Sequence, residues 1–244
     1  MIELSGPSLS HVDRQDHTYL TLAAAHPRLA AKDPNTWGPG AATEAAIRLN
    51  WVDLDETSRD LLPILDALAA KFRERTDLVL CGMGGSSLAP EVIAQTYGKK
   101  IFILDSTDPD YLAHALTGSP ADLLVIVSSK SGSTIETSSQ RAFFEGYLTS
   151  AKLDPTAHIL FVTDPGSPLD IDVRAKGYAV INADPKVGGR FSALTAFGLT
   201  PTALMGVDAS ILLDQAGDLR AQLAQDPVTA LDVSYLLLTQ NEQF

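Results

Sequence analysis

The chain has 244 residues, 45% of them hydrophobic, and its 30 acids against 18 bases give a formal net charge of −12. This composition is typical of a soluble globular protein with a substantial core, and the acidic balance without a Lys/Arg cluster excludes a nucleic-acid backbone as a partner. The single cysteine, Cys81, excludes an internal disulfide, and no Cys/His spacing suggests structural zinc.

No apolar run reaches the roughly 18 residues of a membrane-spanning helix. The first residues, MIELSGPSLSHVDRQDH, are polar and acidic where a signal peptide would need an apolar block. A cytoplasmic location is therefore expected.

Residues 1–75 are expected to be helical or irregular. Apolar residues recur at helical spacing from Leu61 to Phe72, whereas the preceding segment 32–40, KDPNTWGPG, is rich in Pro and Gly and is typical of a loop. This part of the chain is predicted to be an N-terminal helical extension.

Five short apolar runs follow and predict the strands of a sheet. The segments between them are long enough to hold crossover helices, so the pattern favours the α/β class, with a parallel sheet covered on both faces. Three helices are expected after the sheet, at about 191–199, 208–223 and 227–240, with Asp226 and Pro227 as an N-cap and N1 pair. The five predicted strands are Asp77–Cys81, Lys100–Leu104, Leu123–Val127, His158–Val162 and Tyr178–Asn182.

The loop after the third strand, SSKSGSTIET at 128–137, has the chemistry of a phosphate site. Ser133 and Glu136 have capping-box spacing, which predicts Ser133 as the N-cap of a helix that begins at Thr134. Unpaired backbone N–H groups and the helix dipole favour an anion at such a helix start. A cap needs one hydroxyl, whereas this loop has five beside a lysine, so an anion site is favoured over an ordinary polar loop. The hydroxyls are those of Ser128, Ser129, Ser131, Ser133 and Thr134.

A second polar loop, GMGGSSLAP at 82–90, follows the first strand. In a flavodoxin-like strand order the first and third strands are neighbours at the switch point, where ligands bind, so the two loops are expected to converge on one pocket. A dinucleotide fingerprint closed by Asp105 is an alternative, but that motif needs glycine at position 87, which is Ser87, and no P-loop is present. The nucleotide interpretation therefore ranks behind the phosphate site.

A third candidate segment is VGGRFSALTAFGL at 187–199, where Arg190 follows two glycines at the start of an apolar helix. A guanidinium there could stabilise developing oxyanion charge, and a surface salt bridge is the alternative. Cys81 is expected to act as a small buried hydrophobe. Asp164 and Asp172 are interpreted as turn and capping acids, and the five scattered histidines support neither a metal site nor a triad.

The segments GMGGSSLAP, SSKSGSTIET and NADPKVGGRFSALTAFGL together resemble the glucose-6-phosphate isomerase family, and the expected sheet resembles its sugar-isomerase (SIS) domain. They keep the family's order within residues 77–208, although the family often has a threonine-rich loop with an aromatic where this chain has SKSGST. The resemblance implies a flavodoxin-like five-stranded parallel sheet in a first SIS-type domain, residues 76–244, after the extension of residues 1–75.

The resemblance also implies a site for glucose 6-phosphate or fructose 6-phosphate that works without a metal or cofactor. Arg190 would stabilise the enediolate, and Gly85 and Ser86 would lie near the sugar. The residues implied at the phosphate are Ser129, Lys130, Ser131 and Thr134, and Ser133 of the same loop is added as a binding residue.

In this family the proton between C1 and C2 is carried by a glutamate from a second SIS domain, and a histidine and a late lysine also lie downstream of the arginine motif. No second five-strand pattern exists in this sequence, so these groups have no counterpart that can be named. We expect a truncated or split half of an isomerase, as a homodimer or with a missing C-terminal half. The alternative is a non-catalytic sugar-phosphate-binding SIS module.

Overall fold

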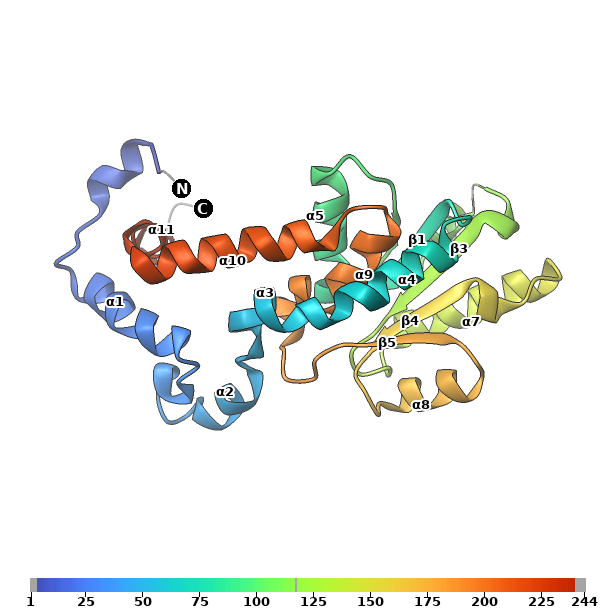
Figure 1. Cartoon of the computed structure of the whole chain (residues 1–244), viewed down its shortest axis with the longest axis horizontal. Helices are drawn as coiled ribbons and strands as arrows, with labels where there is room; N and C mark the ends of the chain where they lie inside the picture. The colour runs from blue at the N-terminus through green and yellow to red at the C-terminus, as the bar shows by residue number, and fades with distance from the viewer. Residues whose placement is uncertain (1–3, 117, 240–244) are drawn as a thin grey trace. The chain divides into compact units, whose positions relative to one another are not determined.

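The computed structural model describes residues 4–116 and 118–239. The chain folds into two compact units, one formed by Leu54–Leu213 and the other by the segments before and after it. Figure 1 labels the helices and strands of both. Across the described residues, no helix is both long and apolar enough to cross a membrane.

The unit Leu54–Leu213 is built on five parallel strands in the order β2-β1-β3-β4-β5. This is the flavodoxin-like order, and it confirms the predicted fold class. All five strands lie within two residues of their predicted bounds, because each is an uninterrupted apolar run of the kind that a sheet buried on both faces requires. The strands are β1 (Asp77–Gly82), β2 (Phe102–Leu104), β3 (Leu123–Ser128), β4 (Ile159–Thr163) and β5 (Ala179–Asn182).

One face of the sheet is covered by α4 (Leu62–Phe72), α5 (Leu88–Thr96) and α9 (Ala196–Leu204), as Figure 1 shows. Alternate strand residues point to this face, among them Leu124 and Ile126 of β3, which are fully buried. Burying side chains of this size stabilises the fold by about 1.5–3 kcal/mol each, which makes this layer a main source of stability.

The opposite face packs against α7 (Ile135–Ser150) and α8 (Pro168–Ala175), with Phe144 of α7 fully buried. Cys81 of β1 points to this side and has no exposed surface, and its burial raises the pKa of the thiol. The cysteine therefore sits where a small hydrophobe would, as expected. Two shorter helices, α3 (Leu54–Thr57) and α6 (Pro109–Ala113), complete the unit with several 3-10 turns.

The prediction of one continuous helix at 191–199 is wrong. The structure has a 3-10 turn, Gly189–Leu194, followed by α9. The break falls at Thr195, whose backbone is extended and whose hydroxyl accepts a hydrogen bond from the N–H of Phe197 at 3.2 Å. A hydrogen bond from a threonine side chain to the backbone competes with continuation of the helix. Here the side-chain cap forms, and α9 begins as a separate helix at Ala196.

The last two helices are α10 (Ala209–Gln225) and α11 (Val228–Thr239). Both lie within two residues of the predicted bounds, although Gln240, the predicted end of the second, falls outside the described residues. The Asp226 carboxylate accepts a hydrogen bond from the N–H of Val228 at 3.0 Å, which is the bond that an N-cap makes.

The other unit contains α1 (His17–Ala30), α2 (Ala42–Arg48) and α11, and its core joins Tyr19 to Leu231 and Tyr235. Buried Asp232 accepts a hydrogen bond from the Tyr19 hydroxyl at 3.0 Å and pairs with Arg14 at 2.8 Å. The hydrogen bond from Arg14 lowers the pKa of Asp232. Residues 14–19 and 231–235, far apart in sequence, are therefore joined through a buried, ion-paired carboxylate.

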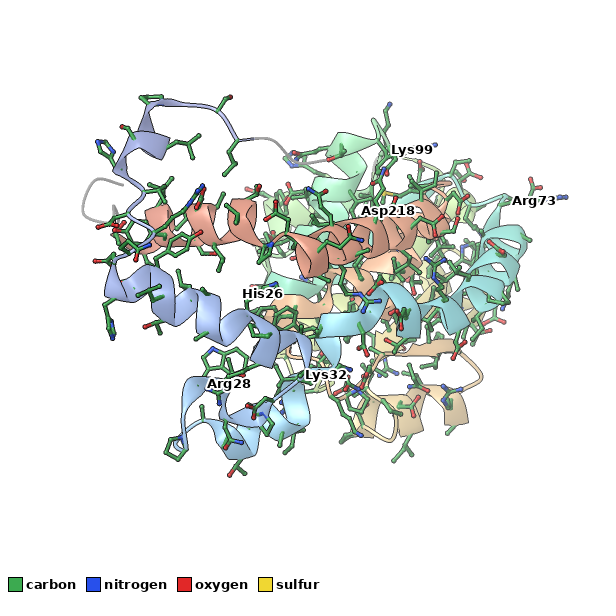
Figure 2. All side chains as sticks on the ribbon, turned by 60° about the vertical axis from the view of Figure 1, so that its left-hand side comes forward. His26, Arg28, Lys32, Arg73, Lys99 and Asp218 are labelled. Carbon is green, nitrogen blue, oxygen red and sulfur yellow. The ribbon has the colours of Figure 1, made fainter. Side chains whose placement is uncertain are left out.

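Two further ion pairs fix the segment after α1, and both cations are labelled in Figure 2. Arg28 lies 2.9 Å from Asp33, and Lys32 lies 2.6 Å from Asp53. Residues 4–75 are helical with short irregular connections, as predicted. The predicted domain boundary between residues 75 and 76 stays a prediction.

Candidate functional site

β1 and β3 end side by side, at the place where flavodoxin-like sheets bind ligands, and we call the region between the loops that follow them the crevice. Gly82 of β1 is in register with Ser128 of β3, so the two loops that follow these strands begin as neighbours. These are the loops predicted to converge, and their place matches the switch point of a flavodoxin-like sheet.

The first loop is in direct contact with the segment that carries Arg190. A methyl group at Gly85 would overlap the carbonyl of Gly189, so the two backbones approach more closely than any side chain would allow. The buried Ser192 hydroxyl is within hydrogen-bonding distance of both carbonyls, 3.1 Å from Gly85 and 2.7 Å from Gly189. The glycines of two predicted motifs, far apart in sequence, therefore meet at one place.

Arg190 follows this contact directly, and its backbone nitrogen lies 3.5 Å from the position of a Cβ on Gly85. Its side chain is exposed. Within the described part of the chain the guanidinium makes no hydrogen bond or ion pair, so the surface salt bridge considered from the sequence does not form there. The arginine is thus held at the crevice by its backbone while its head group faces solvent.

The predicted capping box at the start of α7 is wrong. The N-cap is Thr134 rather than Ser133, the helix begins at Ile135, and no side chain caps it. The Ser133 hydroxyl is instead 2.9 Å from that of Ser131, which also accepts a hydrogen bond from the N–H of Ser133 at 3.2 Å. Because the hydroxyls bond within the loop, the first N–H groups of α7 are left for a ligand or for water.

Helix α5, which follows β1, starts in the same way. Its N-cap, Ser87, is buried and donates its hydroxyl hydrogen to the Gly84 carbonyl at 3.1 Å instead of capping the helix. By contrast, α8 and α9 are capped by the hydroxyls of Ser167 and Thr195. The two helices at the crevice therefore both lack a side-chain cap, which is the arrangement that attracts an anion.

One of the predicted phosphate residues, Ser129, holds the loop in shape. The Ser129 hydroxyl is buried and accepts a hydrogen bond from the N–H of Gly132 at 3.1 Å. Gly132 has a φ of 71°, in the left-handed region, and packs against the side chain of Leu169 of α8. A side chain at position 132 would be strained by its backbone and would collide with the helix.

Lys130 is also engaged, because its ammonium lies 2.9 Å from the carboxylate of Asp164 and 3.4 Å from the Pro185 carbonyl. Both partners of the ion pair are largely shielded from solvent. Asp164, interpreted from the sequence as a turn or capping acid, is therefore an ion-pair partner, and so is Asp172, which pairs with Arg141 and Lys176.

The remaining predicted residues are accessible. Ser131 and Ser133 are exposed, and Thr134 and Ser86 are half-buried. The sequence did not reveal that Ser192 bridges the carbonyls of Gly85 and Gly189. The one feature that could have indicated this role is a hydroxyl two residues after Arg190. Across residues 4–116 and 118–239, no group of three or more His, Cys, Asp and Glu side chains is placed to hold a metal ion.

The close contact at Gly85 predicts a steric effect on stability. Gly85→Ala adds a methyl group that meets backbone rather than a flexible side chain, so we expect a cost of about 1–3 kcal/mol and a Tm lower by several degrees. Gly146→Ala in α7 is the matched control, because its Cβ meets no atom within 4 Å and alanine favours the helix. Thermal unfolding of both variants tests the contact, and equal Tm values would contradict it.

Comparison with known proteins relates the whole arrangement to one family. No protein-family model matches the sequence. The glucose-6-phosphate isomerase of Synechococcus sp. strain JA-3-3Ab is 37% identical over 147 residues, which are 57% of this chain and 28% of that protein. A glucose-6-phosphate isomerase of Thermus thermophilus is 35% identical over 181 residues, which are 70% of this chain and 42% of that protein.

Solved structures agree with this relationship. A hypothetical protein from Thermus thermophilus superposes with a TM-score of 0.76 and 31% identity, over 94% of this chain and 54% of its own. The glucose-6-phosphate isomerase of Chlamydia trachomatis gives a TM-score of 0.66 at 24% identity, over 87% of this chain and 42% of its own. The tagatose-6-phosphate ketose/aldose isomerase of Escherichia coli, with a TM-score of 0.51 at 15% identity over 78% of this chain and 54% of its own, shares the fold.

The likeness of fold agrees with the predicted five-stranded parallel sheet. The chain spans less than half the length of the two curated relatives named above. Over the part that it matches, the chain belongs to the glucose-6-phosphate isomerase family.

Proposed function

We propose that this chain supplies the phosphate-binding part of a glucose-6-phosphate isomerase site, which interconverts glucose 6-phosphate and fructose 6-phosphate through an enediol. The observation that carries the proposal is the pair of uncapped helix starts, α5 and α7, at the neighbouring ends of β1 and β3. Two such termini at one crevice favour a dianionic group even on a protein with a net charge of −12.

In this proposal the phosphate is bound by the start of α7. Its backbone N–H groups and the accessible hydroxyls of Ser131, Ser133 and Thr134 donate to phosphate oxygens. The Ser129 hydroxyl holds the loop in shape by accepting a hydrogen bond from the N–H of Gly132. Lys130 contributes a positive charge, although its ammonium is also paired with Asp164. Gly85 and Ser86 lie beside the sugar in this proposal, because their loop follows β1, the strand next to β3.

Arg190 is proposed to stabilise the enediolate, since a guanidinium stays protonated and offers a rigid pair of donors. Its backbone nitrogen lies close to Gly85, and among the described residues its guanidinium makes no hydrogen bond or ion pair, which supports this role. The reaction also needs a base that takes a proton from C2 and returns it to C1. The carboxylate of Asp164, which contacts the loop, is ion-paired with Lys130 at 2.9 Å and is a poor candidate.

We therefore propose that the base comes from another polypeptide or chain segment, in a homodimer or in a C-terminal half. We also propose that residues 76–244 form the first SIS-type domain and that residues 1–75 extend it. A non-catalytic sugar-phosphate-binding module is the second candidate. It is favoured by the ion pair with Lys130, which occupies Asp164, the carboxylate that contacts the phosphate loop.

Substitutions at the phosphate loop test the shared part of both candidates. Ser131→Ala or Thr134→Ala removes one hydrogen bond to a charged group, worth roughly 1.5–3 kcal/mol, so we expect glucose 6-phosphate to bind about tenfold more weakly or worse. Isothermal titration calorimetry measures this loss. Ser139→Ala, at an exposed position farther along α7, is the matched control and should leave the affinity unchanged.

The same experiment also measures the binding of free glucose and of NADH to the wild-type chain, and either ligand can contradict the proposal. Free glucose lacks the phosphate and should scarcely bind the wild-type chain. Tight binding of NADH without binding of the phosphosugar would replace the proposal by the nucleotide alternative.

A further inference from the structure

The end of β3 contains a hydroxyl with no hydrogen-bond partner. Ser128 is 1% exposed, and its Oγ is one of three buried side-chain polar atoms without a partner among the described residues. The others are Gln140 Oε1 in α7 and Thr200 Oγ1 in α9. Leaving such a group unsatisfied costs about 1–3 kcal/mol, and native structures keep few of them.

The direction of the Ser128 side chain follows from the alternation of β3. Leu124 and Ile126 face the layer of α4, α5 and α9, so Ser128, two residues on, points to the same side. Ser129 points to the opposite side, where it holds the loop that begins α7. Ser128 and Ser129 therefore point to opposite sides of the sheet.

On the face of the sheet that α4, α5 and α9 cover, Ser128 and Ser86 lie on either side of Gly82. A Cβ built on Gly82 would lie 3.5 Å from the Ser128 Cβ and 3.3 Å from the Ser86 Cβ. The two serines thus flank the one strand position that has no side chain, just below the loop that also contacts Gly189. Ser128 thus offers a hydroxyl without a protein partner directly beneath the loop that follows β1, and a ligand bound at that loop is the partner we consider.

We propose that Ser128 is a further binding residue of this site and that its hydroxyl hydrogen-bonds to the sugar part of a bound sugar phosphate. The sugar is chosen over the phosphate because Ser128 lies next to Ser86, which is proposed to border the sugar, and points away from the loop of α7, which is proposed to bind the phosphate. This inference rests on the proposed sugar-phosphate site.

Removal of the hydroxyl then has two effects of opposite sign. In the free protein, Ser128→Ala eliminates an unsatisfied buried polar group, so the variant is at least as stable as the wild type. In the complex, the same substitution loses a hydrogen bond that the ligand alone provides. A purely structural serine would give the reverse, with lower stability and unchanged affinity.

The test is calorimetry and thermal unfolding of the full chain, with glucose 6-phosphate and inorganic phosphate as ligands. We expect Ser128→Ala to weaken glucose 6-phosphate binding by about three- to tenfold, to change phosphate binding by less than about twofold, and to leave Tm equal or higher. Thr200→Val, which removes another unpartnered hydroxyl at constant shape, is the control and should leave both affinities unchanged.

Other results overturn the inference. An unchanged affinity for glucose 6-phosphate in Ser128→Ala, when the wild type binds it, refutes the role of Ser128 and leaves the proposed function standing. Equal losses for glucose 6-phosphate and inorganic phosphate refute the assignment to the sugar. Failure of the wild type to bind glucose 6-phosphate refutes both the proposed function and this inference.

Discussion

Assayed by itself, the 244-residue chain is expected to bind glucose 6-phosphate and yet to convert it to fructose 6-phosphate no faster than a buffer blank. General acid–base groups contribute roughly 10²- to 10⁴-fold each, so a phosphate site and an arginine without them leave little turnover. The resemblance to the family implies a glutamate, a histidine and a lysine beyond the arginine motif, and the chain spans 28% and 42% of two curated relatives.

A coupled assay on protein purified free of host isomerase measures this turnover, with calorimetry on the same sample to show that the site is occupied. A curated isomerase of full length, assayed in parallel, serves as the positive control. Robust turnover that copurifies with the chain and disappears in Lys130 and Arg190 variants would overturn the expectation. It would also require a base from within these residues.

Arg190→Ala is expected to weaken the binding of an enediolate analogue, such as a phosphorylated hydroxamate, by about 10²-fold. The affinity for glucose 6-phosphate itself should fall by less than about threefold, because a donor aimed at developing charge contributes most when that charge is present. Arg190→Lys keeps the charge but loses the planar pair of donors, so an intermediate loss is expected.

The matched control is Arg73→Ala. Arg73 follows α4, is 78% exposed and points into solvent in Figure 2. Its removal changes the net charge by the same amount and should leave both affinities unchanged. Equal losses for analogue and substrate in Arg190→Ala would assign Arg190 to ground-state binding and contradict its role at the enediolate.

The strands could be predicted from the sequence because each is a compact apolar run, and a sheet buried on both faces needs little else. The order β2-β1-β3-β4-β5 could be expected once the flavodoxin-like pattern was recognised. Helix starts were less predictable. At both Ser133 and Thr195, the hydroxyl can bond either within the loop or at the helix start, and local spacing does not decide between these hydrogen bonds.

The site could be predicted in its segments but not in its contacts. Nothing in the sequence pairs Lys130 with Asp164, 34 residues away, or brings Gly85 against Gly189. Both contacts arise from the packing of loops that follow different strands. The direction of Ser128 could have been inferred, because it continues the alternation of Leu124 and Ile126, but its lack of a partner is visible only in three dimensions.

Because Cys81 is buried in β1, the rate at which a reagent labels its thiol can report whether a ligand occupies the crevice. A thiol reacts only when it is accessible and ionised, so a thiol reagent can modify this cysteine only after the sheet opens. A ligand that binds only the native state makes opening rarer, by about 2.7 kcal/mol at a hundredfold excess over Kd. Because Cys81 is the only cysteine, its labelling rate reports occupancy of the crevice directly, without a coupled enzyme or turnover.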